Sequence, residues 1–182
     1  PPTAAHLDEE KYDRLERMGA TLYVAHDCLD RARGFGTADA LARAVRVANQ
    51  GVLEPDGKGG YGAHGVTTGS FREFVARVGN QLGTEPQAWK NSDSFGHVAI
   101  APGWGGRPEW MAQVQALGCD TFLTGEALMF GILFAQEAGI NLIVAGHYAT
   151  ESPGVMALSA RIARDLSLDV TFIPEQIVEA TG

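Results

Sequence analysis

Two short stretches of this sequence place a histidine four residues before a carboxylate, directly after a run of apolar, β-prone residues. The pairs are His26 with Asp30 and His147 with Glu151. Ligands of open α/β sheets gather at the carboxyl ends of strands, so we expect both pairs at one edge of a sheet. Imidazole and carboxylate together form a mixed nitrogen and oxygen ligand set, which suits zinc, iron or manganese better than calcium. The two pairs therefore predict a metal site.

Either pair alone has a plainer interpretation, because a histidine near a strand end is more often a hydrogen-bonded structural residue. The repetition of the pattern at two predicted strand ends favours the metal site. Asp30 and Glu151 would otherwise be carboxylates beside apolar strands, where an unpaired charge is costly. Glu126 follows a third predicted strand, and it either adds a carboxylate to the same cleft or favours the start of its helix. The Gly103–Gly106 turn either presents amides to an anion or simply joins a strand to a helix.

The remaining candidate residues carry weaker signals. His64 and His97 are lone histidines, which we interpret as surface or structural residues, and we interpret Cys28 as a small packing residue. A G-x-G-x-x-G match over 60–65 neither follows a clear strand nor opens a helix, so it does not predict dinucleotide binding.

The composition excludes several classes of protein. Among 182 residues, 45% are hydrophobic and 20% are charged, which excludes global disorder. The net charge of −8 argues against nucleic acid and anionic lipid as main ligands. No apolar run is long enough to span a membrane. Two cysteines are too few for a disulfide framework, which favours a reduced, cytoplasmic setting.

Hydrophobic periodicity and glycine punctuation predict many short elements. Helices are expected over 8–18, 37–50, 71–82, 108–117, 126–138 and 152–166, and strands over 21–25, 95–101, 120–124, 141–145 and 169–173. Pro55–Gly69 is expected to be a glycine-rich loop. Strands alternate with helices after residue 95, which predicts α/β layering with a largely parallel sheet in the second half.

Three segments resemble the signatures of the Nif-three-like proteins, which are often described as GTP cyclohydrolase 1 type 2 homologues. Leu22–Asp30 resembles the family's Y-x-x-H-T-x-L-D segment. Gly118–Glu126 is similar to its G-A-D-x-x-x-T-G-D/E segment, and Ala145–Glu151 is similar to A-G-H-x-x-T-E, the most specific of the three. The resemblance covers the chain from about Lys11 onward.

The resemblance implies a two-lobed α/β fold with mixed sheets flanked by helices. It implies a single domain over 1–182 that lacks the family's N-terminal part, with lobes of approximately 1–90 and 91–182. Subunits of this type typically form a ring-shaped homohexamer, so the resemblance also implies homo-oligomerisation.

The resemblance also implies a dinuclear centre with two divalent cations per subunit, of zinc, iron or manganese. Carried over to this sequence, Asp30, His147 and Glu151 are metal ligands, and His26 is a catalytic residue beside the metals that ligates or relays a proton. The family's first ligands come from a His-His-Pro segment, and this sequence has none ahead of His26. We therefore expect incomplete metal occupancy.

Two functions follow as hypotheses. The first is a metal-dependent hydrolase that acts on a small molecule, with a purine nucleotide such as GTP as the implied substrate. The second is a ring-forming, metal-binding interaction or regulatory protein without catalysis, in which the apolar 126–138 helix serves subunit contact.

Overall fold

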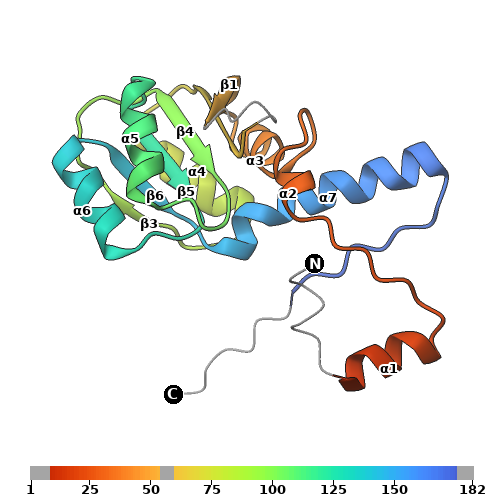
Figure 1. Cartoon of the computed structure of the whole chain (residues 1–182). Helices are drawn as coiled ribbons and strands as arrows, with labels where there is room; N and C mark the ends of the chain where they lie inside the picture. The colour runs from red at the N-terminus through yellow and green to blue at the C-terminus, as the bar shows by residue number, and fades with distance from the viewer. Residues whose placement is uncertain (1–8, 54–59, 176–182) are drawn as a thin grey trace.

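The computed structural model describes residues 9–53 and 60–175, and it contains a six-stranded mixed sheet (Figure 1). The strand order is β1-β2-β4-β5-β6-β3. β4, β5 and β6 run parallel to one another, whereas β1, β2 and β3 join the sheet by antiparallel pairing. The strands are β1 Ala48–Leu53, β2 Gly62–Val66, β3 Gln87–Trp89, β4 His97–Ala101, β5 Thr121–Thr124 and β6 Asn141–Val144.

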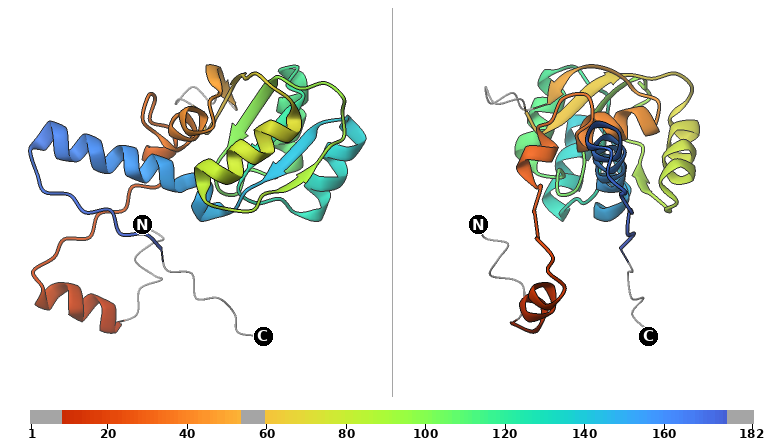
Figure 2. Two further views of the ribbon diagram at one scale, coloured as in Figure 1. Left: turned by 180° about the vertical axis from the view of Figure 1, so that it is seen from behind. Right: turned by 90° about the vertical axis from the view of Figure 1, so that its right-hand side faces the viewer.

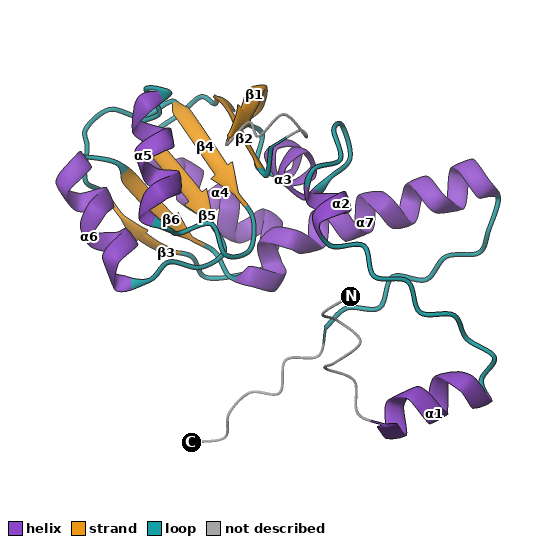
Figure 3. Ribbon diagram, viewed as in Figure 1, coloured by secondary structure: helices purple, strands orange, loops and turns teal. Residues whose placement is uncertain are grey.

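Helices cover both faces of this sheet (Figures 2 and 3). The helices are α1 Glu9–Arg17, α2 Asp27–Asp30, α3 Thr37–Ala44, α4 Phe71–Leu82, α5 Pro108–Ala116, α6 Met129–Ala138 and α7 His147–Leu166. α3 and α4 pack on one face, and α5 and α6 pack on the other. α7 packs against α3 and extends beyond the sheet, while α1 lies apart from the layers (Figure 1).

The central strands are largely apolar because they are buried on both faces. In β5, Leu123 packs toward α3 and α4, and its neighbour Phe122 packs toward α5 and α6. Ile143 and Leu142 of β6 divide in the same way. Such continuous apolar runs are typical of parallel strands, and the predicted parallel sheet in the second half is confirmed.

Two predicted strands are wrong. Residues 21–25 and 169–173 form no strand, and within the described part of the chain no strand pairs with them. Tyr23 is 81% exposed and Ile173 is equally exposed. Their β-prone side chains favour extended backbone, but a strand also needs a hydrogen-bonding neighbour.

The first half of the sheet was not predicted. The expected loop Pro55–Gly69 contains β2, and the helix expected over 37–50 ends at Ala44, so that β1 can follow. The glycines of β2 lower its strand propensity, so the sequence does not indicate a strand there. The sheet nevertheless requires glycine at these positions, because the neighbouring backbone comes very close. A Cβ at Gly62 would lie 2.5 Å from the carbonyl oxygen of Ile100, and one at Gly65 would collide with the carbonyl oxygen of Ala48.

The helix expected over 152–166 begins earlier, at His147, and contains Pro153 in its interior. None of the helices in the described ranges is both long enough and apolar enough to cross a bilayer. The proposed division into lobes near residue 90 stays a prediction.

Candidate metal centre

A cavity of about 410 Å³ lies where the turns after the parallel strands meet the region of α2 and α3. All four residues predicted for the site line it: His26, Asp30, His147 and Glu151. The structure thus brings together side chains that are more than 100 positions apart in the sequence. Their roles as ligands or proton carriers remain predictions.

His147 and Glu151 reach the cavity from the first turns of α7. They are four residues apart, so they share one helix face, and Nε2 of His147 lies 3.2 Å from Oε1 of Glu151. Nδ1 of His147 lies 2.7 Å from Oε1 of Glu126, which follows β5. A proton on Nδ1, donated to Glu126, leaves the lone pair of Nε2 directed toward Glu151. This carboxylate–histidine arrangement is typical of imidazoles that ligate metals through the second nitrogen.

The electrostatics of His147 reflect this environment. Partial burial lowers the pKa of its imidazole, but the hydrogen bond with Glu126 and the negative charges of Glu151 and Glu126 outweigh burial, so the pKa is raised. The negative charges of Glu126 and Glu151 therefore favour positive charge at this position.

Asp27, Asp30 and Glu151 are the carboxylates that line the cavity, and burial disfavours the charged form of Asp30 and of Glu151. Burial raises the pKa of Asp30, although a hydrogen bond from Oγ1 of Thr37 at 2.9 Å opposes the shift. Burial also raises the pKa of Glu151; His147 opposes that shift, and the negative charge of Asp30 adds to it. Two half-buried carboxylates that repel each other, beside an oriented imidazole, form a donor set that fits a divalent cation.

His26 enters the cavity differently from the sequence prediction. Because residues 21–25 form no strand, His26 precedes the short helix α2 and lies at no strand end. Its Nδ1 lies 3.0 Å from Oδ1 of Asp27, and ligand atoms of His26, Asp27 and Asp30 all lie within 4.8 Å of one another. Asp27 was not singled out from the sequence, and its position directly after His26 was the available signal.

The Gly103 turn after β4 packs tightly against the candidate ligands. A Cβ at Gly103 would collide with Oε1 of Glu151 and would lie 3.0 Å from Nε2 of His147. The backbone N–H of Gly103 donates to Oγ1 of Thr150 at 3.0 Å. The turn therefore forms a wall of the site, and this close approach requires glycine.

Aromatic side chains form another part of the cavity lining. Trp104, Trp110 and Tyr61 line it together with Arg107. The guanidinium of Arg107 lies 4.0 Å from the ring centre of Trp104, and the rings of Tyr61 and Trp110 stack with centroids 6.1 Å apart. Aromatic rings beside the positive charge of Arg107 suit a planar, negatively charged ligand.

Cys28 does not line this cavity. It is exposed, so the interpretation of Cys28 as a packing residue is wrong, whereas Cys119 is buried.

The layered fold and the imidazole–carboxylate cavity define an α/β protein with a candidate metal centre. Residues 2–177 match the sequence profile of the family described as Duf34/NIF3 (NGG1p interacting factor 3), and the chain belongs to this family. The match confirms the resemblance seen in the sequence.

Named relatives and solved structures agree with this assignment. The chain is 30% identical over 178 residues to the GTP cyclohydrolase 1 type 2 homolog of Pseudomonas aeruginosa. This alignment covers 94% of this chain and 68% of the relative. It is 32% identical over 168 residues to the homolog of Escherichia coli K12, with 90% and 66% covered. The solved structure of protein ybgI, described as of unknown function, is similar with a TM-score of 0.79 and 28% identity, over 92% of this chain and 68% of that one.

Proposed function

We propose that this chain binds divalent cations in the cavity of Asp30, His147 and Glu151 and hydrolyses a purine nucleotide there. The observation that carries the proposal is that these three side chains and His26 line one cavity. The choice of a purine nucleotide as substrate is supported by the names of the relatives, which are GTP cyclohydrolase 1 type 2 homologs. The chain spans about two thirds of these relatives, so the activity in their names comes to this chain as a proposal.

Asp30, His147 and Glu151 would hold the cation, with Thr37 fixing Asp30 and Glu126 fixing the His147 ring. When bound, a divalent cation supplies the positive charge that makes a water molecule acidic enough to act near neutral pH. His26 contacts Asp27 through Nδ1, so Nε2 is the ring nitrogen that could exchange a proton with a ligand.

The cavity walls support a nucleotide as the ligand class. Trp104 and Tyr61 each carry a guanidinium over one ring face, that of Arg107 and that of Arg31, so a purine would stack on the aromatic surface that these contacts leave. Arg107 also lines the cavity and offers a guanidinium for a phosphate. One arginine is a modest phosphate site, so we expect weak binding of the phosphates relative to the base.

The proposal is tested by metal analysis and nucleotide turnover on the whole chain. We expect the purified chain, loaded with zinc, iron(II) or manganese(II), to consume GTP with release of formate, measured by chromatography. The double variant His147→Ala with Glu151→Ala should lose the cavity metal and the turnover while its circular dichroism is unchanged.

A matched control is Arg161→Ala with Asp165→Ala. This pair has the same four-residue spacing on the same helix, with an ion pair of 3.2 Å, and it does not line the cavity. It should retain metal and turnover. If the wild-type chain holds metal but turns over no nucleotide or phosphoester, the hydrolase is rejected.

A second candidate function is that of a ring-forming interaction protein. The observation that favours it is the exposed apolar surface on and before α6, where Met129 and Phe130 are 65% and 68% exposed and Leu128 and Leu133 are also exposed. A cluster of large apolar side chains in solvent is typical of a subunit contact. In this alternative the cavity metal is structural.

A further inference from the structure

A second group of potential ligands lies at the other end of the parallel strands. His97 is the first residue of β4, Cys119 lies two residues before β5, and His64 is in the middle of β2. The candidate metal centre follows the carboxyl ends of β4 and β5, so this group is at their amino ends. It shares no residue with the cavity described above.

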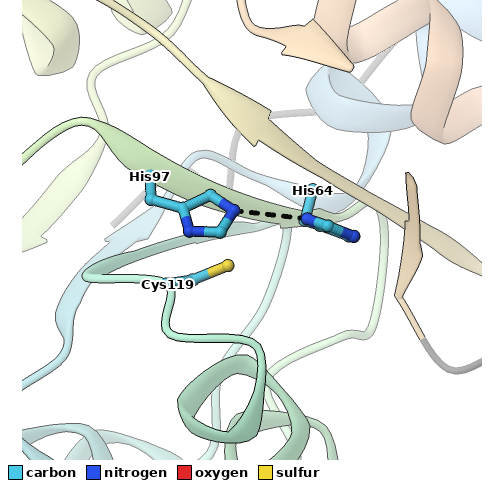
Figure 4. Close-up of side chains that lie close together, drawn as sticks. All are labelled: His64, His97 and Cys119. Carbon is cyan, nitrogen blue, oxygen red and sulfur yellow. Dashed lines mark hydrogen bonds between the residues drawn. The ribbon is translucent and has the colours of Figure 1, made fainter. Parts of the chain in front are cut away.

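The three side chains converge closely. Nδ1 of His64 and Nε2 of His97 lie 3.3 Å apart, and Sγ of Cys119 completes a set in which every ligand atom is within 4.8 Å of the others. Figure 4 shows the Cys119 sulfur pointing toward the two imidazole rings. Two nitrogens bound to one tetrahedral zinc, each at about 2.0–2.1 Å, would be about 3.3 Å apart. The histidine pair therefore already has the required spacing.

Strand register explains why the two histidines meet. In the antiparallel pair β2–β4, His64 lies opposite Ala99 and His97 lies opposite Val66, so the histidines are diagonal neighbours on one face. Gly51 of β1 lies opposite His64 on the other side, and a Cβ there would collide with Nε2 of His64. The glycine thus provides the space for this ring orientation.

Asp120 fixes the third component relative to His97. Its carboxylate accepts hydrogen bonds from the backbone N–H groups of Gly96 and His97, each at 3.2 Å, and from Oγ1 of Thr121 at 2.8 Å. The backbone N–H of Asp120 donates to the carbonyl of His97 at 2.9 Å. These bonds hold the α5–β5 turn, and Cys119 with it, against the start of β4.

A simpler interpretation is a hydrogen bond between two neutral imidazoles beside a packed thiol. The two interpretations differ at Cys119, whose sulfur is a packed thiol in the first and a ligand in the second. Two imidazoles and one sulfur, all with ligand atoms within 4.8 Å of one another, form a donor set that suits zinc, whereas magnesium and calcium prefer oxygen ligands.

We propose that His64, His97 and Cys119 form a second metal site that binds zinc through two imidazoles and one thiolate. Asp120 is engaged in the hydrogen bonds above, so water occupies the fourth position of a tetrahedral site. Zinc here links β2, β4 and the α5–β5 turn, and its role is to stabilise this end of the sheet.

Cobalt(II) titration of the whole chain tests the proposal, because cobalt replaces zinc and its bond to thiolate gives a charge-transfer absorption. The candidate ligands of the cavity contain no sulfur, so this band reports the second site alone. We expect the band in the wild-type chain, its loss on zinc addition, and its absence from Cys119→Ser. It should persist in Cys28→Ser, the control at the other cysteine, and in His147→Ala with Glu151→Ala.

His64→Gln provides a variant that does not disturb a fully buried residue, because His64 is only partly buried. We expect it to weaken zinc binding at this site at least tenfold while circular dichroism is unchanged. Absence of the thiolate band from the wild-type chain, or an unchanged band in Cys119→Ser or His64→Gln, would overturn the proposal. Persistence of the band in the cavity variant separates this outcome from failure of the hydrolase proposal.

Discussion

Gly154 of α7 packs directly on Thr37, the first residue of α3. A Cβ at Gly154 would lie 2.7 Å from Cα of Thr37, a backbone atom that cannot rotate away. Thr37 holds Asp30 through a hydrogen bond of 2.9 Å, and α7 carries His147 and Glu151. The contact between these two helices therefore sets how closely the two sequence-distant halves of the candidate metal centre approach.

Replacement of Gly154 by alanine tests this coupling. Alanine in a helix interior normally stabilises by about 0.5–1 kcal/mol relative to glycine. Here we expect the reverse, a loss of about 1–3 kcal/mol from overpacking, measured by urea denaturation. Zinc binding at the cavity should weaken as α7 moves from α3. Val155→Ala, at the exposed neighbouring position, is the control and should change neither quantity appreciably. A more stable Gly154→Ala chain would show that the helices separate without cost.

Asp30→Asn tests whether the buried carboxylate is retained for a cation. The asparagine oxygen can still accept the Thr37 hydrogen bond, so the change removes charge with little change of shape. Burial raises the pKa of Asp30 in the folded chain. The stability linked to its proton is complete below about pH 4, the ordinary value, and is lost as pH rises through the raised pKa. In the metal-free chain the variant should therefore be more stable than wild type at neutral pH, and the difference should shrink toward about pH 4.

With added zinc, we expect the wild-type chain to be more stable than Asp30→Asn at neutral pH. A ligand at one hundred times its dissociation constant stabilises by about 2.7 kcal/mol, and the variant should forfeit most of this gain at the cavity. Asp93→Asn is a control for which the opposite pH dependence of stability is expected. A hydrogen bond from Lys90 lowers the pKa of Asp93, so its stabilising effect is present above about pH 4 and is lost as pH falls. Equal zinc stabilisation of wild type and Asp30→Asn would place the cation elsewhere.

Phe130→Asp tests the apolar surface at α6. If this surface is a subunit contact, a buried charge is costly there, and light scattering should show a shift from oligomer to monomer. Gln136→Asp adds the same charge at an exposed polar position of the same helix and should leave the assembly unchanged. A wild-type chain that is monomeric at high concentration contradicts the interaction proposal before any variant is made.

Helix α4 and the parallel strands with their helices could be predicted because their signals are local. Ser70 and Glu73 form the expected capping box, and Gly83 and Gly139 end their helices in the left-handed conformation. β5 and β6 are short apolar runs between such helices, and burial on both faces gives them this composition. Local chemistry and the tertiary environment agree in these elements.

The strands of the first half, β1 and β2, could not be predicted because they depend on distant partners. β1 and β2 contain glycines at positions of close backbone approach, including Gly51 and Gly65, and these lower the local strand signal. Residues 21–25 carry a strong local signal but gain no partner strand in the described chain. Strand propensity alone does not determine pairing.

The candidate site also contains residues that could be predicted from the sequence and residues that could not. The spacing of His147 and Glu151 indicates a shared helix face. Their convergence with Asp30 was expected from two predicted strand ends and from the family signatures, and because residues 21–25 form no strand, only the family signatures remain as its basis. Tyr61 and Arg107 reach the cavity from turns whose paths no periodicity describes. The meeting of His64, His97 and Cys119 depends on the register between β2 and β4.

Glu126 has a testable role that goes beyond orienting a ring. In Glu126→Gln the amide oxygen can still accept the Nδ1 proton of His147, but the negative charge is lost. Since the hydrogen bond and charge of Glu126 help to raise the pKa of His147 against the effect of burial, we expect that pKa to fall, measured by NMR titration of the imidazole. At about pH 8, where protons compete little, zinc affinity of the cavity should fall about 10–100-fold. Glu137→Gln removes the same charge from an exposed position of α6 and should alter neither the pKa nor the affinity. An unchanged His147 pKa in Glu126→Gln would mean that the 2.7 Å contact contributes no electrostatic stabilisation, and the assignment of Glu126 as the residue that positions this ligand would fail.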